Sequence, residues 1–481
     1  MIQCGRSFIV AGLLLTLPAL HGQTSDRAGT GNSYLKRIEL HFVKMAEAGL
    51  DRFGPHSTPM WMSVLNTRTG HAILDHTPPR VYRLIGAPGG TTLYWDQPML
   101  VAAHELSRLT GRASFAIMAD RYVTSFLQRC VNERGMFQWG NHQYYDATKD
   151  EVIHFTGGYH ELRPITPAWE LFWKQAPTET DRYIRMMVQR HIFDPESGGF
   201  NRHDDRTKGH AFIESGGILV ESLAWLYQKT NDPELLRLAL KIAQYTHSHR
   251  GASTGLIVNE PDKGRWDSKV STTEVGVWAQ SLLRASKLTA NEAFTEMAET
   301  GVSAYLKYGF DADAKKYFGQ ISVTDGTPVT PDDPGYWPRK YSNPWNLDQW
   351  PTHDYSMPFA EACITLFAQT GIDRFKQSIY RWAQVVADDA QSNSGKGAYA
   401  EHYGRCIHFL TRAGRVLGDQ ALTRQARELA HEAVTKLEDN DMFQSFPETH
   451  LYRSVDGLGY LFLALISLEQ GAELELYGFG F

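Results

Sequence analysis

The chain has 481 residues, of which 42% are hydrophobic and 21% are charged, a composition typical of a folded globular protein. Its net charge is −6 and it contains no cluster of basic residues, so a nucleic-acid-binding function is not expected. The length allows one large domain or several ordinary ones.

The first 22 residues have the features of an export signal peptide. Arg6 supplies a positive charge, residues 8–20 are uncharged and mostly apolar, and the sequence Leu20-His21-Gly22 predicts cleavage after Gly22. The apolar run of about 13 residues is too short for a membrane span. We therefore expect an exported protein, periplasmic or secreted, with no membrane span in the mature chain. An uncleaved anchor is the alternative.

Helix pairs dominate the rest of the chain. Residues 23–94 predict a less regular lead-in segment that packs on a toroid, and residues 95–481 predict one catalytic domain, because no linker divides them. In this domain an amphipathic helix is repeatedly followed by a short polar turn and a second amphipathic helix. The predicted helices span residues 97–109, 114–127, 216–227, 235–247, 274–288, 293–308, 357–369, 375–388, 398–417, 422–437 and 457–468.

The arrangement of these pairs predicts the fold class. A helix pair buries little surface by itself, so successive pairs must stack. We predict an all-α protein, an (α/α) toroid of about six to seven helical hairpins with long rim loops. An open solenoid is the alternative, but the long inserts at 135–165, 195–212, 251–272 and 318–356 make the spacing uneven. Loops on a rigid scaffold commonly carry the functional residues, so we expect the site in these inserts.

The cysteines do not predict a disulfide framework. Cys4 precedes the apolar run of the signal, and Cys130, Cys363 and Cys406 are far apart and odd in number. All three occur in apolar, helical sequence, so buried thiols are expected.

Three segments of the inserts contain chemically useful residues. They are Trp139-Gly140-Asn141-His142, His160-Glu161-Leu162-Arg163 and Arg202-His203. Two imidazoles and one carboxylate, from His142, Glu161 and His203, suit a first-row divalent metal and leave positions for substrate oxygen. The alternative is that both histidines only form hydrogen bonds in polar loops.

These segments resemble polysaccharide lyase family 2, the bacterial pectate lyases built on an (α/α) toroid. Members of that family carry a Trp-Gly-x-His segment, a His-Glu-Leu-Lys segment and an Arg-His pair in this order. The present sequence differs in having Arg163 in place of the lysine and Pro164 in place of an asparagine, and its loop after His203 is shorter. These differences reshape the sugar cleft, so the expected substrate is a uronate-containing polysaccharide or oligosaccharide, pectate-like but not restricted to homogalacturonan.

The resemblance implies a metal-dependent β-elimination. It implies that His142, Glu161 and His203 bind a divalent transition metal, with Mn²⁺ as the first expectation and Ni²⁺, Zn²⁺ or Ca²⁺ as alternatives. It also implies that Arg202 is the Brønsted base that removes the C5 proton of a uronate. Because arginine is normally protonated, a clamp for the substrate carboxylate is the alternative role of Arg202.

A further set of residues is expected to bind substrate, because aromatic rings pack on pyranose faces and cations pair with carboxylates. Well-packed loops are the alternative explanation for the same residues. The set comprises Trp139, Tyr144, Tyr145, Arg163, Trp337, Arg339, Trp345, Trp350 and His353.

Three other functions remain as alternatives. A glycoside hydrolase of the α/α-toroid type acting on glucuronyl or uronyl oligosaccharides would need an acid and a base carboxylate. A sugar epimerase would use histidine bases, and a non-catalytic sugar-binding protein would need the aromatic loops alone. The candidate carboxylates for the hydrolase are Glu214, Glu221, Glu274, Asp354 and Glu401.

Overall fold

A computed structural model describes most of the chain. The described residues are 33–75, 86–139, 143–154, 160–162, 165–208, 211–261, 267–329, 340–345, 357–392 and 397–471. The predicted signal peptide lies outside them.

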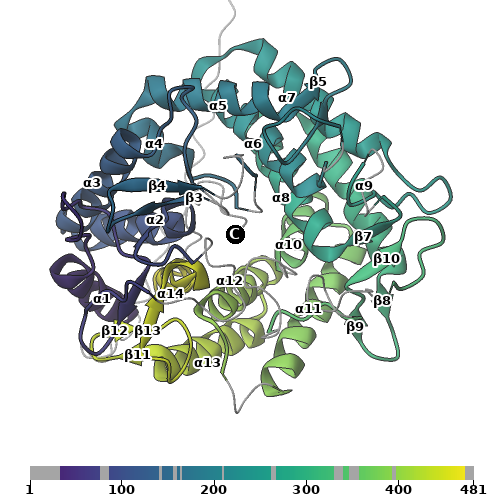
Figure 1. Cartoon of the computed structure of the whole chain (residues 1–481). Helices are drawn as coiled ribbons and strands as arrows, with labels where there is room; N and C mark the ends of the chain where they lie inside the picture. Colours follow the sequence, from purple (N-terminus) through teal and green to yellow (C-terminus); the bar gives the residue numbers. More distant parts are fainter. Residues whose placement is uncertain are drawn as a thin grey trace, which may run out of the picture.

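The helices form a closed ring in which inner and outer helices alternate along the chain (Figure 1). The inner helices are α2 (Leu93–Thr110), α4 (Trp169–Gln175), α6 (Ile213–Thr230), α8 (Thr272–Thr289), α10 (Met357–Thr370), α12 (Ala400–Leu417) and α14 (Leu458–Gln470). The outer helices are α1 (Tyr34–Ala48), α3 (Ser114–Arg129), α5 (Pro177–His191), α7 (Pro233–Ser248), α9 (Glu292–Tyr308), α11 (Asp373–Ser392) and α13 (Gln420–Leu437).

Burial separates the two sets of helices. In α14 every residue from Leu458 to Leu468 is buried, so this helix has no solvent-facing stripe. In α7 the buried residues include Leu235, Ala239 and Ile242, which recur at helical spacing and form a single stripe. Inner helix α14 is therefore apolar on all sides, whereas outer helix α7 is amphipathic.

Two glycines allow inner helices to approach closely. A Cβ atom on Gly459 of α14 would lie 2.3 Å from the backbone nitrogen of Met99 in α2, and one on Gly404 of α12 would lie 2.4 Å from the backbone nitrogen of Leu461 in α14. No side chain fits at either position. The inner ring is therefore closed by direct packing of helix backbones.

The two rims of the ring differ in loop length. Each turn from an inner to an outer helix, such as 111–113, 231–232 and 418–419, has only a few residues. Most connections from outer to inner helices are longer, and they contain all the strands of the described residues. These are β1 (Val64–Asn66), β2 (Gly90–Thr91), β3 (Gln143–Asp146), β4 (Glu151–His154), β5 (Ile192–Asp194), β6 (Gly199–Phe200), β7 (Lys269–Ser271), β8 (Phe310–Asp311), β9 (Lys316–Tyr317), β10 (Gln320–Ser322), β11 (Glu438–Asp439), β12 (Met442–Phe443) and β13 (Leu451–Arg453).

The lead-in segment takes part in closing the ring. Helix α1 packs against α14 and α2, and β1 pairs antiparallel with β13. Buried Asp96 of α2 accepts hydrogen bonds from Tyr122 Oη at 2.7 Å, from Tyr452 Oη at 3.1 Å and from the Ser454 hydroxyl. One carboxylate thus connects α2, α3 and the segment that precedes α14.

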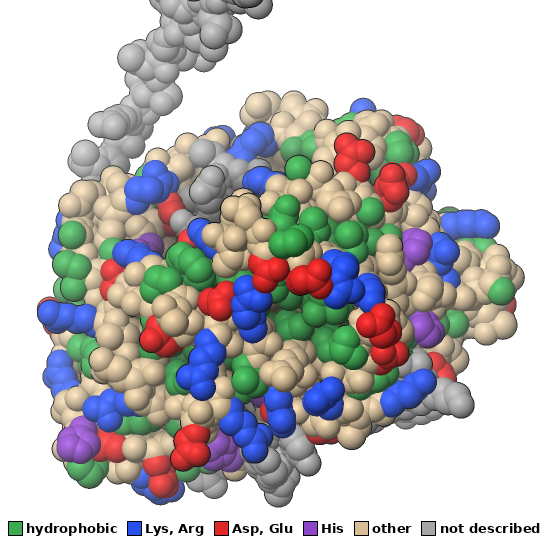
Figure 2. Space-filling view, turned by 90° about the horizontal axis from the view of Figure 1, so that it is seen from above, with side chains coloured by type: hydrophobic (Ala, Val, Ile, Leu, Met, Phe, Trp, Pro, Cys, Tyr) green, Lys and Arg blue, Asp and Glu red, His purple; other side chains and the backbone are tan. Residues whose placement is uncertain are grey.

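The predicted all-α toroid is confirmed. Cys130, Cys363 and Cys406 are free and buried, as expected, and burial raises the pKa of the Cys130 thiol to about 12. Within the described residues, no helix combines the length and the apolar character that a membrane crossing requires. On the side of the ring seen in Figure 2, basic and acidic side chains are interspersed with small apolar patches.

Candidate active site

Two loop segments place Glu161 opposite His203. The Leu162 N–H donates to the Arg202 carbonyl at 2.9 Å, and the Asp204 N–H donates to the His160 carbonyl at 3.1 Å. Glu161 and His203 are the directly paired residues of this antiparallel bridge. Directly opposed residues of an antiparallel pair project their side chains on one face. The fold therefore brings together two sequence segments about forty residues apart, as the predicted site requires.

The side chains of Arg202 and His203 both lie next to the Glu161 carboxylate. The Arg202 guanidinium donates to Glu161 Oε1, and His203 Nε2 lies 3.6 Å from the same oxygen. The Glu161 side chain is 5% exposed, whereas that of His203 is 31% exposed. The Arg202 guanidinium carbon also lies 4.8 Å from the centre of the Phe212 ring. The result is a buried carboxylate with a cation on one side and a more accessible imidazole on the other.

Glu161 and His203 fit two positions of a divalent transition-metal site. Two ligand atoms that each lie about 2.1 Å from one ion are roughly 3–4 Å apart, and the observed separation is 3.6 Å. Within the described residues no group of three His, Cys, Asp or Glu side chains forms a metal cluster. The third predicted ligand, His142, lies outside the described residues.

A buried network that the sequence did not reveal supports both segments. His191, at the end of α5, contacts the Asn201 carbonyl through Nδ1 at 2.8 Å and His160 Nδ1 through Nε2 at 2.8 Å. His160 Nε2 in turn lies 2.5 Å from Tyr183 Oη, and Trp139 Nε1 donates to the same hydroxyl at 3.0 Å. The network therefore connects the residue before Glu161 with the residue before Arg202.

The Asn201 carbonyl fixes which groups donate and which accept hydrogen bonds in this network. The Asn201 carbonyl can only accept, so His191 carries its proton on Nδ1 and presents Nε2 as an acceptor. His160 then donates from Nδ1 and accepts from the Tyr183 hydroxyl at Nε2. Burial lowers the pKa of His191 to about 4, and burial together with neighbouring His191 lowers the pKa of His160 well below its ordinary value. Both imidazoles are therefore neutral at physiological pH and act as fixed hydrogen-bonding groups.

Four of the aromatic residues predicted to bind substrate are buried in the structure. Trp139 is 3% exposed and packs among Tyr94, Phe126, Phe137 and Phe172, and Trp345 is 1% exposed and donates to the Val386 carbonyl at 2.9 Å. Tyr144 is buried over Gly90, and Tyr145 is buried with its hydroxyl donating to Asp150 at 2.8 Å. Rings in such environments have no free face for a sugar. We interpret all four as core residues.

Several predicted residues cannot be placed. Those that lie outside the described residues are His142, Arg163, Trp337, Arg339, Trp350, His353 and Asp354.

Two of the carboxylates considered for a hydrolase are held by arginines. Glu221 accepts two hydrogen bonds at 2.7 Å from Arg284, and Glu401 accepts one at 2.8 Å from Arg405. Burial raises the pKa of Glu401 to about 7, although Arg405 opposes this shift. Glu214 and Glu274 are buried in the first turns of α6 and α8. Ion pairing inside the ring is a structural role, so Glu221 and Glu401 are weak candidates for acid–base chemistry.

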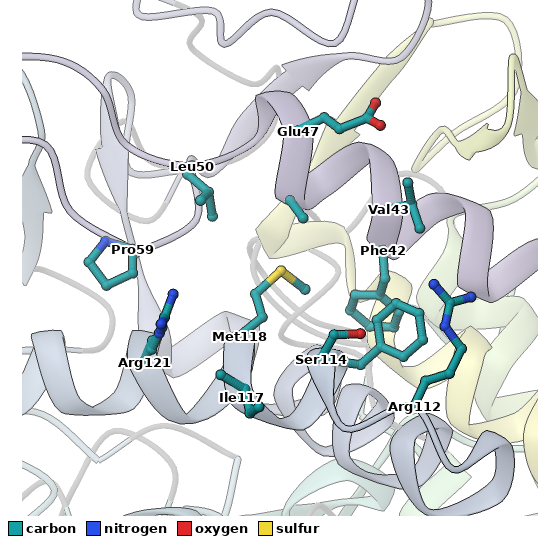
Figure 3. Close-up of a pocket in the computed structure, with 12 residues that line it drawn as sticks. Phe42, Val43, Glu47, Leu50, Pro59, Arg112, Ser114, Ile117, Met118 and Arg121 are labelled. Atoms are coloured by element: carbon teal, nitrogen blue, oxygen red, sulfur yellow. The ribbon is translucent and has the colours of Figure 1, made fainter.

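A separate cavity of about 510 Å³ lies on the outside of the ring between α1 and α3 (Figure 3). Its walls include Phe42 and Val43 of α1 and Ile117 and Met118 of α3. None of the residues predicted for catalysis or metal binding lines it.

Several solved structures resemble this chain in fold. A family 76 glycoside hydrolase from a bovine Bacteroides thetaiotaomicron strain superposes with a TM-score of 0.50 at 10% identity, covering 91% of this chain and 78% of that one. The cellobiose 2-epimerase of Bacillus thermoamylovorans gives 0.49 at 9% identity, with coverage of 91% and 98%. The unsaturated glucuronyl hydrolase of a Bacillus species gives 0.46 at 13% identity, with coverage of 93% and 97%. The first of these supports the toroid fold.

The family comparison is more specific to the site. Residues 95–212 match the model of a family described as periplasmic pectate lyase. The matched range contains all three segments on which the sequence resemblance was based, including Glu161, Arg202 and His203. The resemblance is confirmed over this part of the chain, and with it the prediction of a carbohydrate-active enzyme.

Proposed function

We propose that this protein is a metal-dependent polysaccharide lyase that cleaves uronate-containing polysaccharide by β-elimination. The observation that carries the proposal is the position of the Arg202 and His203 side chains next to the Glu161 carboxylate at an antiparallel bridge. The match of residues 95–212 to a pectate lyase family supports the same chemistry.

The reaction removes a weakly acidic proton. A base takes the C5 proton, which lies α to the uronate carboxylate, and the electron pair forms a C4–C5 double bond as the C4–O4 bond breaks. The leaving oxygen takes up a proton, so the products are a new chain end and a 4,5-unsaturated uronate. A divalent metal, when bound, supplies Lewis acidity toward the substrate carboxylate.

The described residues supply defined parts of such a site. Glu161 and His203, together with His142, would hold the metal. Burial of Glu161 limits its access to water, and the hydrogen bonds of Asn201 and His160 fix both segments. Arg202 lies against Glu161, and we propose it as the base that removes the C5 proton. In the ion pair it is a cation, so acting as a base requires release from Glu161 and loss of a proton.

The substrate and location follow from the same resemblance. We propose an acidic polysaccharide or oligosaccharide rich in uronate as the substrate. We also propose export to the periplasm or the medium, in keeping with the family description and the N-terminal sequence.

Product analysis tests the proposal. Purified protein is incubated with polygalacturonate and other uronate polymers, with EDTA and then with added Mn²⁺. Ultraviolet absorbance of the conjugated uronate, growing only with metal, is the expected result. Reducing ends without that absorbance would mean hydrolysis, and retention of the polymer without any product would mean a binding protein; either result refutes the lyase.

Arg202→Ala and Arg202→Lys then test the assigned residue. We expect the alanine variant to lose at least about a hundredfold in kcat, because a general base contributes about two to four orders of magnitude. A lysine that acts as a base would give activity that rises at alkaline pH, whereas a lysine clamp would retain the wild-type pH profile with a higher KM. Near wild-type kcat in the alanine variant would remove Arg202 from the mechanism.

A further inference from the structure

A cavity beside the candidate active site is lined by four arginines. It has a volume of about 300 Å³, and its lining residues are Arg134, Arg182, Met186, Gln189, Arg190 and Arg206. They come from three segments: the loop after α3, one face of α5 and the loop that follows β6. The chain has a net charge of −6, so a cavity lined by four guanidinium groups differs in sign of charge from the protein as a whole.

Most of this positive charge is not neutralised. Arg190 has Asp204 at 3.5 Å, but no carboxylate of the described residues lies within ion-pair distance of Arg134, Arg182 or Arg206. Arg182 makes a long hydrogen bond of 3.5 Å to the Glu133 carbonyl. Arg134, Arg182 and Arg206 are solvent-exposed, so water and salt screen the repulsion between them and their guanidinium groups are accessible to an anion.

A tight turn sets the backbone conformation of Arg206. Arg206 has a φ of 58°, a left-handed conformation that it shares with nine other non-glycine residues of the described chain. Here the conformation places Arg206 on the wall of the cavity.

The cavity is connected to the active site through one short loop. Arg202 and His203 lie at the start of this loop and Arg206 lies at its end. Between them, Asp204 accepts a hydrogen bond from the His160 N–H at 3.2 Å while it faces Arg190. The cavity and the candidate site therefore share one loop, and Asp204 contacts residues of both.

We propose that this arginine-lined cavity binds carboxylate groups of a uronate chain next to the segment that reacts. The arginine fork matches a carboxylate in two parallel hydrogen bonds, and Arg182, Met186 and Gln189 recur at helical spacing on one face of α5. The proposal rests on the proposed function for its substrate class, but binding and cleavage can be measured separately.

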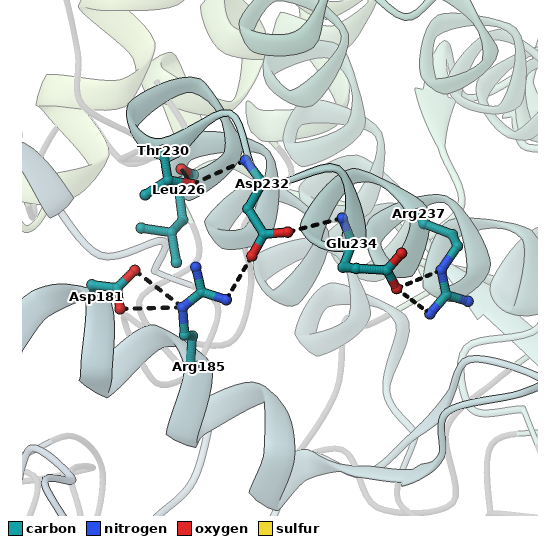
Figure 4. A network of polar contacts seen from close by, with 7 residues as sticks. All are labelled: Asp181, Arg185, Leu226, Thr230, Asp232, Glu234 and Arg237. Atoms are coloured by element: carbon teal, nitrogen blue, oxygen red, sulfur yellow. Dashed lines mark hydrogen bonds and ion pairs between the residues drawn. The ribbon is translucent and has the colours of Figure 1, made fainter.

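Isothermal titration in the presence of EDTA measures binding without turnover. The ligand is hexagalacturonate, the test variant is R182Q/R206Q, and the control is Arg185→Gln on the same helix. Arg185 is bound to Asp181 and Asp232, between α5 and the start of α7, and does not line the cavity (Figure 4). Thermal melting confirms that each variant is folded.

Loss of two charge-assisted contacts predicts at least about tenfold weaker binding in R182Q/R206Q and less than about twofold change in the control. Fully methyl-esterified hexagalacturonate should bind the wild type and the double variant equally weakly. Equal hexagalacturonate affinity of wild type and double variant would overturn the proposal, and so would equal weakening by the control substitution.

A kinetic experiment separates this result from the proposed function. If polygalacturonate is cleaved, R182Q/R206Q should raise KM with little change in kcat. Failure to detect any elimination product, together with arginine-dependent hexagalacturonate binding, would refute the lyase and leave the binding site standing. Elimination with unchanged KM and unchanged affinity would refute the binding site alone.

Discussion

His191 shows how much a single buried side chain can determine. It makes no contact with Glu161 or Arg202, but its two nitrogens hold the chain on both sides of the candidate site. Its local sequence, Arg190-His191-Ile192, carries no motif. Only the tertiary contact with the Asn201 carbonyl gives it a positioning role.

The low pKa of His191 predicts a specific pH dependence of stability. Its folded-state pKa of about 4 lies below the ordinary value of 6.5, so the unfolded chain binds a proton that the folded chain does not. Stability therefore falls as pH falls through this window, by up to roughly 3 kcal/mol from this group. Urea denaturation at neutral pH and at about pH 5 measures the free energy of unfolding at each pH. Between the two, we expect His191→Gln to lose less of this free energy than the wild type.

Activity provides a second readout for His191. Because Gln can still donate to the Asn201 carbonyl but is less rigid than an imidazole, we expect His191→Gln to retain the fold and to lower kcat through looser placement of Arg202. An identical loss of stability with pH in both proteins would contradict the assignment of a neutral, buried imidazole.

Several helices end at a residue with a left-handed backbone conformation. Helices α2 and α12 end at Gly111 and Gly418, both with left-handed backbone, whereas α8 ends at Ala290 with φ of 54°. Nothing lies within 4 Å of a Cβ atom built on Gly111, so only backbone strain distinguishes glycine from alanine there.

These caps give a matched pair of substitutions. Ala290→Gly should stabilise the protein by about 0.5–1 kcal/mol, because it relieves the left-handed alanine. Gly111→Ala should destabilise it by about 1 kcal/mol for the converse reason. Urea denaturation of both variants measures the changes, and equal signs would show that the caps do not control these helix ends.

At the element scale the sequence also missed a helix pair. Helices α4 and α5 were not predicted, because α4 has only seven residues and Pro177 follows it after a single residue. Helix α5 does carry a regular buried stripe that includes Tyr183, Met187 and His191. That stripe is present in the sequence, between the predicted inserts 135–165 and 195–212.

At the scale of the whole molecule, stability depends on ring closure. Helix α14 joins the end of the chain to α2 near its beginning, and Gly459 leaves no space for a side chain at this contact. Asp96 bonds to Tyr452 and Ser454 across the same junction. Loss of packing here affects the whole ring rather than one hairpin.

Gly459→Ala tests closure. We expect the free energy of unfolding to fall by about 3 kcal/mol, because the added methyl group must displace the backbone of α2. Chemical denaturation measures the change, with Gly111→Ala as a comparison that introduces strain without a steric clash. A smaller loss for Gly459→Ala than for Gly111→Ala would show that α14 is not tightly packed on α2.

The sequence by itself determined the helical repeat, the toroid and the three segments of the candidate site. Apolar periodicity and turn residues are local properties, and a helix pair with one apolar stripe must stack on another. The direct pairing of Glu161 with His203 was implied only by resemblance.

Tertiary structure decided which polar and aromatic side chains are accessible. Trp139 and Trp345 are of the residue type that packs on sugar rings, but both are core residues. Whether such a ring is covered depends on neighbours that are distant in the sequence, such as Phe172 and Tyr403. The arginine cavity likewise joins Arg134, Arg182 and Arg206 from three separate segments. Charge clusters formed by distant residues are invisible in a linear pattern, since their energy depends on distances that only the fold sets.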